Sequence, residues 1–479
     1  MSAAAALVVA AALAGCGNTT YFAGRTLPPS GIANRVLIAI QNPSAAIGGA
    51  LMFVDAYYDI RYKYNSTNTN PAFPIAGFSG SLPVTIQNMP VEQIGAVYNS
   101  GGNNALTMVS YAQEKTTGNV SGLNGAAASV FTTRDQTYVF AANQATHVLT
   151  VVDKSATNGG SFPFSLPGVY RVSVNPGGSV ALAFVQNTNY VYYPVKLTAA
   201  ETASYSGGPS TWPKGAVDCE PQNDPGWCLF QALGSDGNKL TFDRPIKAVF
   251  SADGGTAYIL NCGPECGGTK ASVTPLPIAP MIFLLGQQSG SLPATTSAST
   301  QCGTVNSASG CIPIPGGASN ALVDSSTLYV VGQQYISGYW GGNLTVVDLS
   351  SNTPAAPISI SDGAPGAPSR MVLADDDTLW IAMTKCANGV RAATSLPFGC
   401  LAMVNTSTNA ATLMPYNEDA TGIAAVTGLH KVYAAEGGQV YIFSTVNGAA
   451  IDNSNVTMTG TVVDVAYMDA TSDSDNTVY

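Results

Sequence analysis

The sequence predicts an all-β fold built from one repeated supersecondary unit. Residues 138–141 and 148–152 are short runs rich in β-branched and aromatic residues, and the polar stretch 143–146 separates them. Such a pattern is typical of a β-hairpin. It returns along the chain, for example at 327–349 and 431–445. Recurrence of one unit every few tens of residues predicts a repeat architecture.

The amino-acid composition agrees with an all-β fold and disfavours some classes of binding partner. Only 10% of the 479 residues are charged, while 46% are hydrophobic and glycine (50), proline (29) and tyrosine (22) are spread along the chain. This composition favours strands and turns over disorder. The net charge of −10 disfavours nucleic acid and anionic membrane surfaces as partners.

A further strand precedes the hairpin in the clearest units. Residues 170–182, 246–258 and 369–380 each read as a strand, a tight turn of Asp, Asn or Gly, and the first hairpin strand. Asp-Gly and Pro-Gly-Gly supply the positive φ angles that such turns need.

Counting these units predicts a β-propeller with seven blades over residues 35–479, with eight as the alternative. The seven units are 35–59, 128–153, 170–197, 246–278, 319–349, 369–406 and 422–445. Residues 93–121 are either an eighth unit or an elaboration. We expect strands near 462–466 to pair with those at 35–59, which closes the ring. An open β-sandwich array, or two separate β domains, would also fit the repeated strands.

The units resemble the repeats of YVTN-type surface β-propellers. In those repeats, a strand and an S-x-D-G turn precede a hydrophobic-Tyr-Val strand, and a V-x-V-I-D strand follows. Here SADGGTAYIL at 251–260 and VLTVVD at 148–153 carry the likeness. The resemblance covers roughly residue 35 to the end, and it implies a fold without implying a ligand.

The N-terminus predicts export. Residues 1–14 are small and apolar, too short to span a membrane, and they fit the apolar region of a secretory signal. Leu13-Ala14-Gly15-Cys16 resembles the lipobox of bacterial lipoproteins. That resemblance implies a signal peptide at 1–15, lipid attachment at Cys16, a tether at 16–34 and, from Gly17, an outer-membrane address. The alternative is a buried apolar segment with an incidental cysteine.

The other eight cysteines fall into close pairs, which in an exported chain predict disulfides that close loops. The pairs are Cys219/Cys228, Cys262/Cys266, Cys302/Cys311 and Cys386/Cys400. A metal knuckle at Cys262/Cys266 is the alternative, although no histidine lies nearby. Two pairs fall in insertions near 198–243 and 286–315, the first of which we expect to decorate one face.

Residue types that carry chemistry are scarce, so we predict a protein that is not an enzyme. The only histidines are His147 and His430, and no nucleophile elbow or phosphate-binding loop is present. We expect no cofactor. Calcium is the alternative at two acidic clusters: Asp375, Asp376 and Asp377, and Asp469, Asp473 and Asp475.

Aromatic residues near hairpin connections indicate a binding face, with packing between blades as the alternative. They are Tyr57, Tyr58, Tyr62, Tyr64, Tyr190, Tyr192, Tyr193, Tyr335, Tyr339 and Trp340. We therefore expect a lipid-anchored envelope protein that binds or scaffolds an envelope protein or a glycan, of unspecified oligomeric state.

Two further hypotheses stay open. The first is a lactonase-like or lyase-like propeller enzyme with a site at the mouth of the central channel. Residues at predicted inner strands would converge there, namely Arg134, Arg171, Arg244, Arg370 and Asp253. The second is a structural component of a surface layer or adhesion system.

Overall fold

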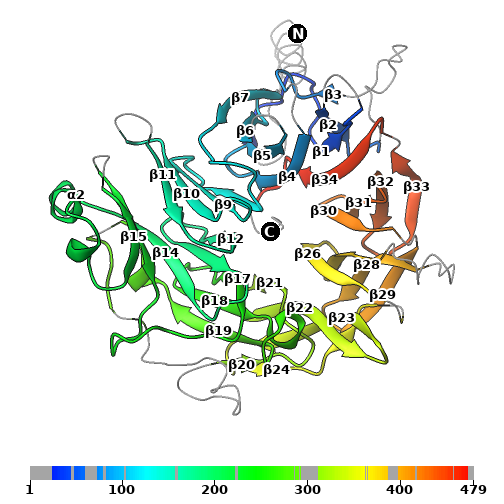
Figure 1. Cartoon of the computed structure of the whole chain (residues 1–479). Coiled ribbons are helices and arrows are strands. Elements are labelled where there is room, and N and C mark those ends of the chain that lie inside the picture. The colour runs from blue at the N-terminus through cyan, green and yellow to red at the C-terminus, as the bar shows by residue number, and fades with distance from the viewer. Residues whose placement is uncertain are drawn as a thin grey trace, which may run out of the picture.

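Eight small antiparallel sheets stand in a ring around a central channel (Figure 1). The structure is a computed structural model that describes residues 24–472, with gaps at 45–47, 60–72, 79–81, 102–103, 157–159, 222–224, 285, 291, 293–310, 362, 364, 387–397, 416–417 and 457. The all-β propeller expected from the sequence is confirmed. The preferred count of seven blades is wrong, because the sheets number eight.

In the first four blades the strands are given from the channel outward. Blade 1 contains β34 (Thr461–Tyr467), β1 (Arg35–Gln41), β2 (Gly49–Asp55) and β3 (Phe73–Pro74). Blade 2 contains β4 (Leu82–Met89), β5 (Ile94–Ser100), β6 (Ala105–Ser110) and β7 (Lys115–Val120). Blade 3 contains β8 (Ser129–Thr132), β9 (Tyr138–Asn143), β10 (Val148–Asp153) and β11 (Gly160–Ser165). Blade 4 contains β12 (Val169–Val174), β13 (Ala181–Val185), β14 (Val191–Lys196), β16 (Trp227–Gln231) and β15 (Ala216–Glu220).

The remaining four blades follow the same plan. Blade 5 contains β17 (Pro245–Phe250), β18 (Thr256–Asn261), β19 (Ser272–Pro277) and β20 (Ile312–Pro313). Blade 6 contains β21 (Asn320–Asp324), β22 (Thr327–Ile336), β23 (Tyr339–Asp348), β24 (Thr353–Pro354) and β25 (Ile358–Ser359). Blade 7 contains β26 (Ala367–Ala374), β27 (Thr378–Thr384), β28 (Phe398–Asn405) and β29 (Ala410–Pro415). Blade 8 contains β30 (Ala420–Val426), β31 (Lys431–Glu436), β32 (Gln439–Ser444) and β33 (Ala450–Val456).

The described helical elements are short and lie in connections between strands. They are α2 (Ala199–Tyr205) and the 3₁₀ turns η2 (Pro209–Thr211), η3 (Gly263–Cys266) and η4 (Ala279–Met281). Thr198 caps α2 by accepting from the Glu201 backbone N–H, and the Glu201 side chain bonds back to the Thr198 backbone. No described helix is long and apolar enough to cross a membrane.

Residues 93–121, the stretch left open in the sequence, belong to a complete blade. They supply β5 to β7 of blade 2, and β4 lies on the channel side. The β4–β5 turn contains no Asp-Gly or Pro-Gly signal. Its left-handed position, φ 56°, is taken by Gln93, whose N–H donates to the Pro90 carbonyl. A non-glycine residue in that conformation leaves little trace in a sequence, which explains the undercount.

Strands from the two ends of the chain close the ring, as expected. β34 pairs with β1 in antiparallel register, with Leu37 opposite Ala466, and β1 continues to β2 with Leu37 opposite Phe53. The C-terminal strand therefore supplies the inner strand of blade 1. Arg35 is fully buried beside this junction.

The insertion at 198–243 extends a sheet instead of covering a face. β16 pairs with β14, and β15 pairs with β16, so the insertion forms the outer edge of blade 4. Figure 1 shows α2 and β15 at the periphery, far from the channel. Trp227 anchors the insertion, since it is fully buried and its Nε1–H donates to Asp153 of blade 3. Most of the second insertion lies outside the described residues.

Disulfide bonds are present, as expected. They join Cys219 to Cys228, Cys262 to Cys266 and Cys386 to Cys400. Cys311 is also disulfide-bonded. Cys302, its expected partner, lies outside the described residues.

We define the upper face of the ring as the face at which the inner strand of each blade begins. The lower face then carries the turns between first and second strands. Asp253 in the β17–β18 turn is one example, where its carboxylate accepts from Ser251 Oγ and from the Gly255 N–H. The adjacent Gly254 has a φ of +70°, which glycine adopts without strain.

Candidate functional site

A cavity of about 250 Å³ opens at the upper mouth of the channel. The starts of four successive inner strands line it, from β12, β17, β21 and β26, together with η3. A second hollow of about 280 Å³ adjoins it and shares Tyr170, Ile246 and Cys266 with it. The channel mouth therefore offers a concave site.

Lys247 lines this cavity and is fully buried. Its Nζ donates to Asn320 Oδ1 at 2.6 Å, and the Asn320 amide in turn donates to the Ser369 carbonyl at 2.7 Å. These bonds join the inner strands of blades 5, 6 and 7. Burial, and then the positive charges of Arg171 and Arg370, hold the pKa of the Lys247 amine well below its usual value.

Arg171 forms the wall beside Lys247. It is partly buried, and its guanidinium carbon lies 5.7 Å from the centre of the Tyr170 ring. Among the described residues, no carboxylate forms an ion pair with Arg171. Arginine stays charged even where burial lowers its pKa, as it does here. The side chain thus presents a permanent positive charge to the cavity.

Arg370 of blade 7 is held by Asp464 of blade 1, two blades further around the ring. Arg370 Nη2 lies 3.1 Å from Asp464 Oδ2 and 3.2 Å from Thr85 Oγ1. The Asp464 carboxylate also accepts from the backbone N–H of Ile86 and of Val465. Burial raises the pKa of the Asp464 carboxyl, and the charge of Arg370 opposes that rise.

Glu265 of η3 stands at the cavity edge. Its carboxylate accepts from the Gln333 backbone N–H at 3.0 Å, which ties the β22–β23 hairpin to the cavity. Burial raises the pKa of this carboxyl, while that hydrogen bond and the more distant charge of Lys385 lower it. The site thus combines cations, an amide and a carboxyl of perturbed acidity, which is a common feature of ligand sites.

The inner-strand residues expected to converge do so only in part. Arg171 and Arg370 reach the channel, and Arg244 lines the adjoining hollow. Arg134 and Asp253 lie in turns on the lower face, because each follows the end of its inner strand.

Reasoning from the sequence missed four polar residues of the channel. They are Lys247, Asn320, Glu265 and Asp464. A lysine or aspartate inside an apolar strand is a usable signal, because such residues are seldom fully buried without a partner. Lys247 and Asp464 both stand in such strands.

The aromatic residues divide between packing and exposure. Tyr192 packs into the core between blades 3 and 4, and Tyr193 stacks on Phe230 at 5.7 Å. Tyr335 at the tip of the β22–β23 hairpin is 62% exposed and lies 5.5 Å from the Trp340 ring. Tyr57 and Tyr58 are exposed, and Tyr62 and Tyr64 lie outside the described residues.

Three described carboxylates of the two acidic clusters already hold hydrogen bonds or ion pairs. Asp375 Oδ2 accepts from the backbone N–H groups of Gly428 and His430, and Asp376 contacts His430 Nδ1 at 2.9 Å. Asp469 is buried against Arg35. Asp473 and Asp475 lie outside the described residues. His147 is an exposed turn residue whose Nδ1 accepts from the Gly168 N–H.

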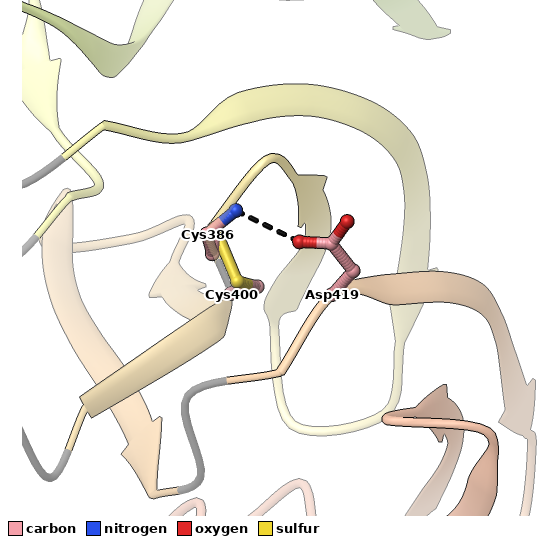
Figure 2. Close-up of side chains that lie close together, drawn as sticks. All are labelled: Cys386, Cys400 and Asp419. Atoms are coloured by element: carbon pink, nitrogen blue, oxygen red, sulfur yellow. Dashed lines mark hydrogen bonds between the residues drawn. A yellow bond between two sulfur atoms is a disulfide. The ribbon is translucent and has the colours of Figure 1, made fainter. Parts of the chain in front are cut away.

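One described group has metal-ligand residue types close together, namely Cys386, Cys400 and Asp419. Figure 2 shows the disulfide between the cysteines and the Cys386 backbone N–H donating to Asp419, at 2.8 Å. A sulfur in a disulfide is not a thiolate ligand. This group is therefore a disulfide cross-link with a carboxylate hydrogen-bonded to its backbone.

Comparisons with known proteins give distant structural likenesses and no family. No protein-family model matches the chain, and no curated protein matches its sequence. Among solved structures, the dihydro-heme d1 dehydrogenase NirN is 13% identical with a TM-score of 0.49, over 93% of this chain and 77% of that one. The periplasmic gluconolactonase PpgL of Pseudomonas aeruginosa is 12% identical with a TM-score of 0.47, over 91% and 98%. Hydrazine synthase of Kuenenia stuttgartiensis is 13% identical with a TM-score of 0.45, over 80% and 99%.

Proposed function

We propose that the protein is a binding protein of the bacterial envelope whose upper face takes an acidic glycan. One observation carries the proposal. Arg171 presents a permanent positive charge to a cavity at the channel mouth, in a chain whose net charge is −10. A local cationic pocket on an acidic protein favours a ligand with a negative group, and arginine binds carboxylates in a bidentate manner.

The β22–β23 hairpin supports a sugar ligand. Gln333 fixes the hairpin to Glu265 at the cavity edge, and two residues further on Tyr335 presents an exposed ring beside Trp340. Sugar rings stack on such exposed aromatic faces. A chain of uronate residues would place a carboxylate at Arg171 and sugar faces at the hairpin.

Calorimetric titration with an oligogalacturonate and with a neutral galactose oligomer of equal length tests the proposal. We expect the acidic oligomer to bind and the neutral one to bind weakly. Arg171→Gln should weaken binding by roughly 10- to 100-fold, because a hydrogen bond to a charged group contributes about 1.5–3 kcal/mol. Tyr335→Ala should weaken it without changing the melting temperature.

Arg134→Gln is the matched control, since it removes the same charge from the lower face. Equal affinity for both oligomers, or equal loss in Arg134→Gln and Arg171→Gln, would overturn the glycan assignment. If the protein instead binds an envelope protein, and Arg171→Gln does not weaken that binding, the partner would be a protein and not a glycan.

The lipid anchor stays a prediction, because Cys16 lies outside the described residues. The fold is compatible with it. Arg25 bonds to the carbonyls of Pro90 and Ala470, so the described N-terminal residues lie at the lower face. An anchor at Cys16 would then turn the lower face toward the membrane and the channel mouth away from it.

Intact mass and detergent-phase partitioning of the protein made in a Gram-negative host test the anchor. We expect a diacylglyceryl mass increment and cleavage before Cys16, both absent in Cys16→Ser. An unmodified, aqueous-phase protein in both forms would leave a secreted propeller. The surface-layer hypothesis predicts large assemblies of the purified protein, which light scattering would detect.

The enzyme hypothesis has one specific observation in its favour. Lys247 and Glu265 line the same cavity, and burial moves the pKa of the amine down and that of the carboxyl up. Opposed shifts of this kind are typical of acid–base pairs.

A further inference from the structure

Lys247 is placed as nucleophilic lysines are. It comes from an inner strand, lines the cavity, and its Nζ donates to Asn320 Oδ1 at 2.6 Å. Asn320 is itself fixed to blade 7 through the Ser369 carbonyl. An amine on a rigid strand, oriented by a second fixed side chain, is pre-organised for attack on a bound group.

The charge environment gives this amine its reactivity. Only a neutral amine carries the lone pair that attacks carbon, and a lysine in water is protonated at neutral pH. Removal from water and adjacent cations both disfavour the ammonium form. Lys247 meets both conditions, since it is fully buried and the charges of Arg171 and Arg370 act on it.

We propose that Lys247 forms a reversible imine with small carbonyl compounds that carry a carboxylate, of the 2-oxo acid class, while Arg171 holds the carboxylate. The inference rests on the anionic-ligand site proposed above. A 2-oxo acid places its carbonyl carbon directly beside its carboxylate. A carboxylate on Arg171 therefore brings the carbonyl toward the neighbouring Lys247, within the same cavity of about 250 Å³.

The step balances without any oxidant or reductant. The Nζ lone pair forms a bond to the carbonyl carbon, and the carbonyl π pair moves to oxygen. A proton moves from nitrogen to that oxygen, which gives a carbinolamine. The C–O bond then breaks, the oxygen leaves as water with a second proton, and the C=N bond forms. Glu265, whose carboxyl lines the cavity and is biased by burial toward its protonated form, is placed to supply a proton to the leaving oxygen.

Reductive trapping tests the proposal. The full-length protein is incubated with glyoxylate and cyanoborohydride at neutral pH, and the product is analysed by intact mass and peptide mapping. We expect one reduced adduct, on the peptide that contains Lys247. Lys115, which is exposed, serves as an internal control and should stay unlabelled. Lys247→Met, matched in length, should lose the adduct.

Arg171→Gln guards against a misfolded Lys247 variant, because it leaves the nucleophile in place. It should lower the yield with glyoxylate and leave the yield with acetaldehyde, which has no carboxylate, unchanged. Labelling spread over exposed lysines, or a Lys247→Met protein labelled as the parent, would overturn the proposal. Glycan binding without an adduct would overturn the nucleophile and leave the proposed function standing. An adduct without glycan binding would overturn the proposed function and leave Lys247 standing as the nucleophile.

Discussion

Individual buried charges join inner strands of blades that are not direct neighbours in the ring. Arg370 and Asp464 are 94 residues apart in sequence, yet they form an ion pair at 3.1 Å. Thr85, 285 residues from Arg370, completes the contact. Each partner is costly to bury without the other, so the pair is sensitive to the loss of either one.

Arg370→Met should therefore lower the free energy of unfolding by about 3–5 kcal/mol at neutral pH, because it removes the guanidinium that pairs with a buried carboxylate. Burial already raises the pKa of folded Asp464 above its unfolded value. The folded state thus holds this proton more tightly, and the associated stability is present at low pH and lost as the pH rises through the folded pKa. Removing Arg370 takes away an influence that lowers this pKa.

The loss of unfolding free energy in Arg370→Met should consequently shrink as the pH is lowered toward the unfolded pKa of aspartate. Urea denaturation at neutral and mildly acidic pH measures it. The double variant Arg370→Met/Asp464→Asn should recover part of the loss at neutral pH. A deficit that stays constant with pH would contradict the assignment to Asp464.

His430 offers a second test at this scale, on the lower face. Its hydrogen bond and charge contact with Asp376 raise the pKa of the imidazole above the ordinary value. Stability from this contact is present below the unfolded pKa and is lost as the pH rises through the higher folded pKa. NMR titration should show the raised pKa, and Asp376→Asn should bring it down. Asp377→Asn is the control and should leave the raised value in place.

At the scale of single elements, close approach of backbones explains where glycines are needed. Gly332 lies in β22, and a Cβ there would collide with the backbone of Gly317 and Ala318. The loop before β21 therefore packs directly on the strand that leads to the aromatic hairpin.

Gly332→Ala should destabilise the protein by about 1–3 kcal/mol, as overpacking does. It should also weaken glycan binding, since this contact positions the strand that leads to the β22–β23 hairpin. Gly118→Ala in β7 is the control, because nothing lies within 4 Å of its added Cβ. Thermal and urea unfolding of both variants, with calorimetric binding, measure the two effects. Equal free energies of unfolding for Gly332→Ala and Gly118→Ala would show that the loop before β21 moves to accommodate the added methyl group.

At the scale of the whole molecule, the ring depends on joining its two ends. Arg35 of β1 is fully buried, donates to both carboxylate oxygens of Asp469, and also contacts Glu114 of blade 2 at 2.9 Å. One guanidinium thus ties the N-terminal strand, the C-terminal segment and the next blade together. Closure of this kind removes the free edges that a curved array of sheets would expose.

Asp469→Ala should cost about 3–5 kcal/mol, because it removes one partner of a buried ion pair. We expect earlier unfolding in urea and faster proteolysis at both ends of the chain. Asp324→Asn, at an exposed turn, should change stability by less than about 0.5 kcal/mol. Unfolding of Asp469→Ala at the parent's urea concentration would show that strand pairing alone closes the ring.

Much of the fold was predictable because its signals are local. The hairpins, their Asp-Gly turns and the close cysteine pairs depend on residues a few positions apart, such as Cys262 and Cys266. The pairing of the last strand with the first also followed, because a propeller has to close. Blade 2 was undercounted because Gln93 took a left-handed turn position that usually belongs to glycine or asparagine.

The site was less predictable, because it exists only after separate blades pack side by side. Arg134 and Arg171 look equivalent along the chain, yet one follows its inner strand and the other lies at the start of one, so they reach opposite faces. Arg171, Lys247 and Asn320 meet because blades 4, 5 and 6 pack side by side. Asp464 reaches Arg370 because the last strand returns to blade 1. The sequence by itself determined the repeating strands and their turns, since those are short-range. Tertiary structure decided the blade count and the charges that share the channel, since these depend on how the blades pack around one axis.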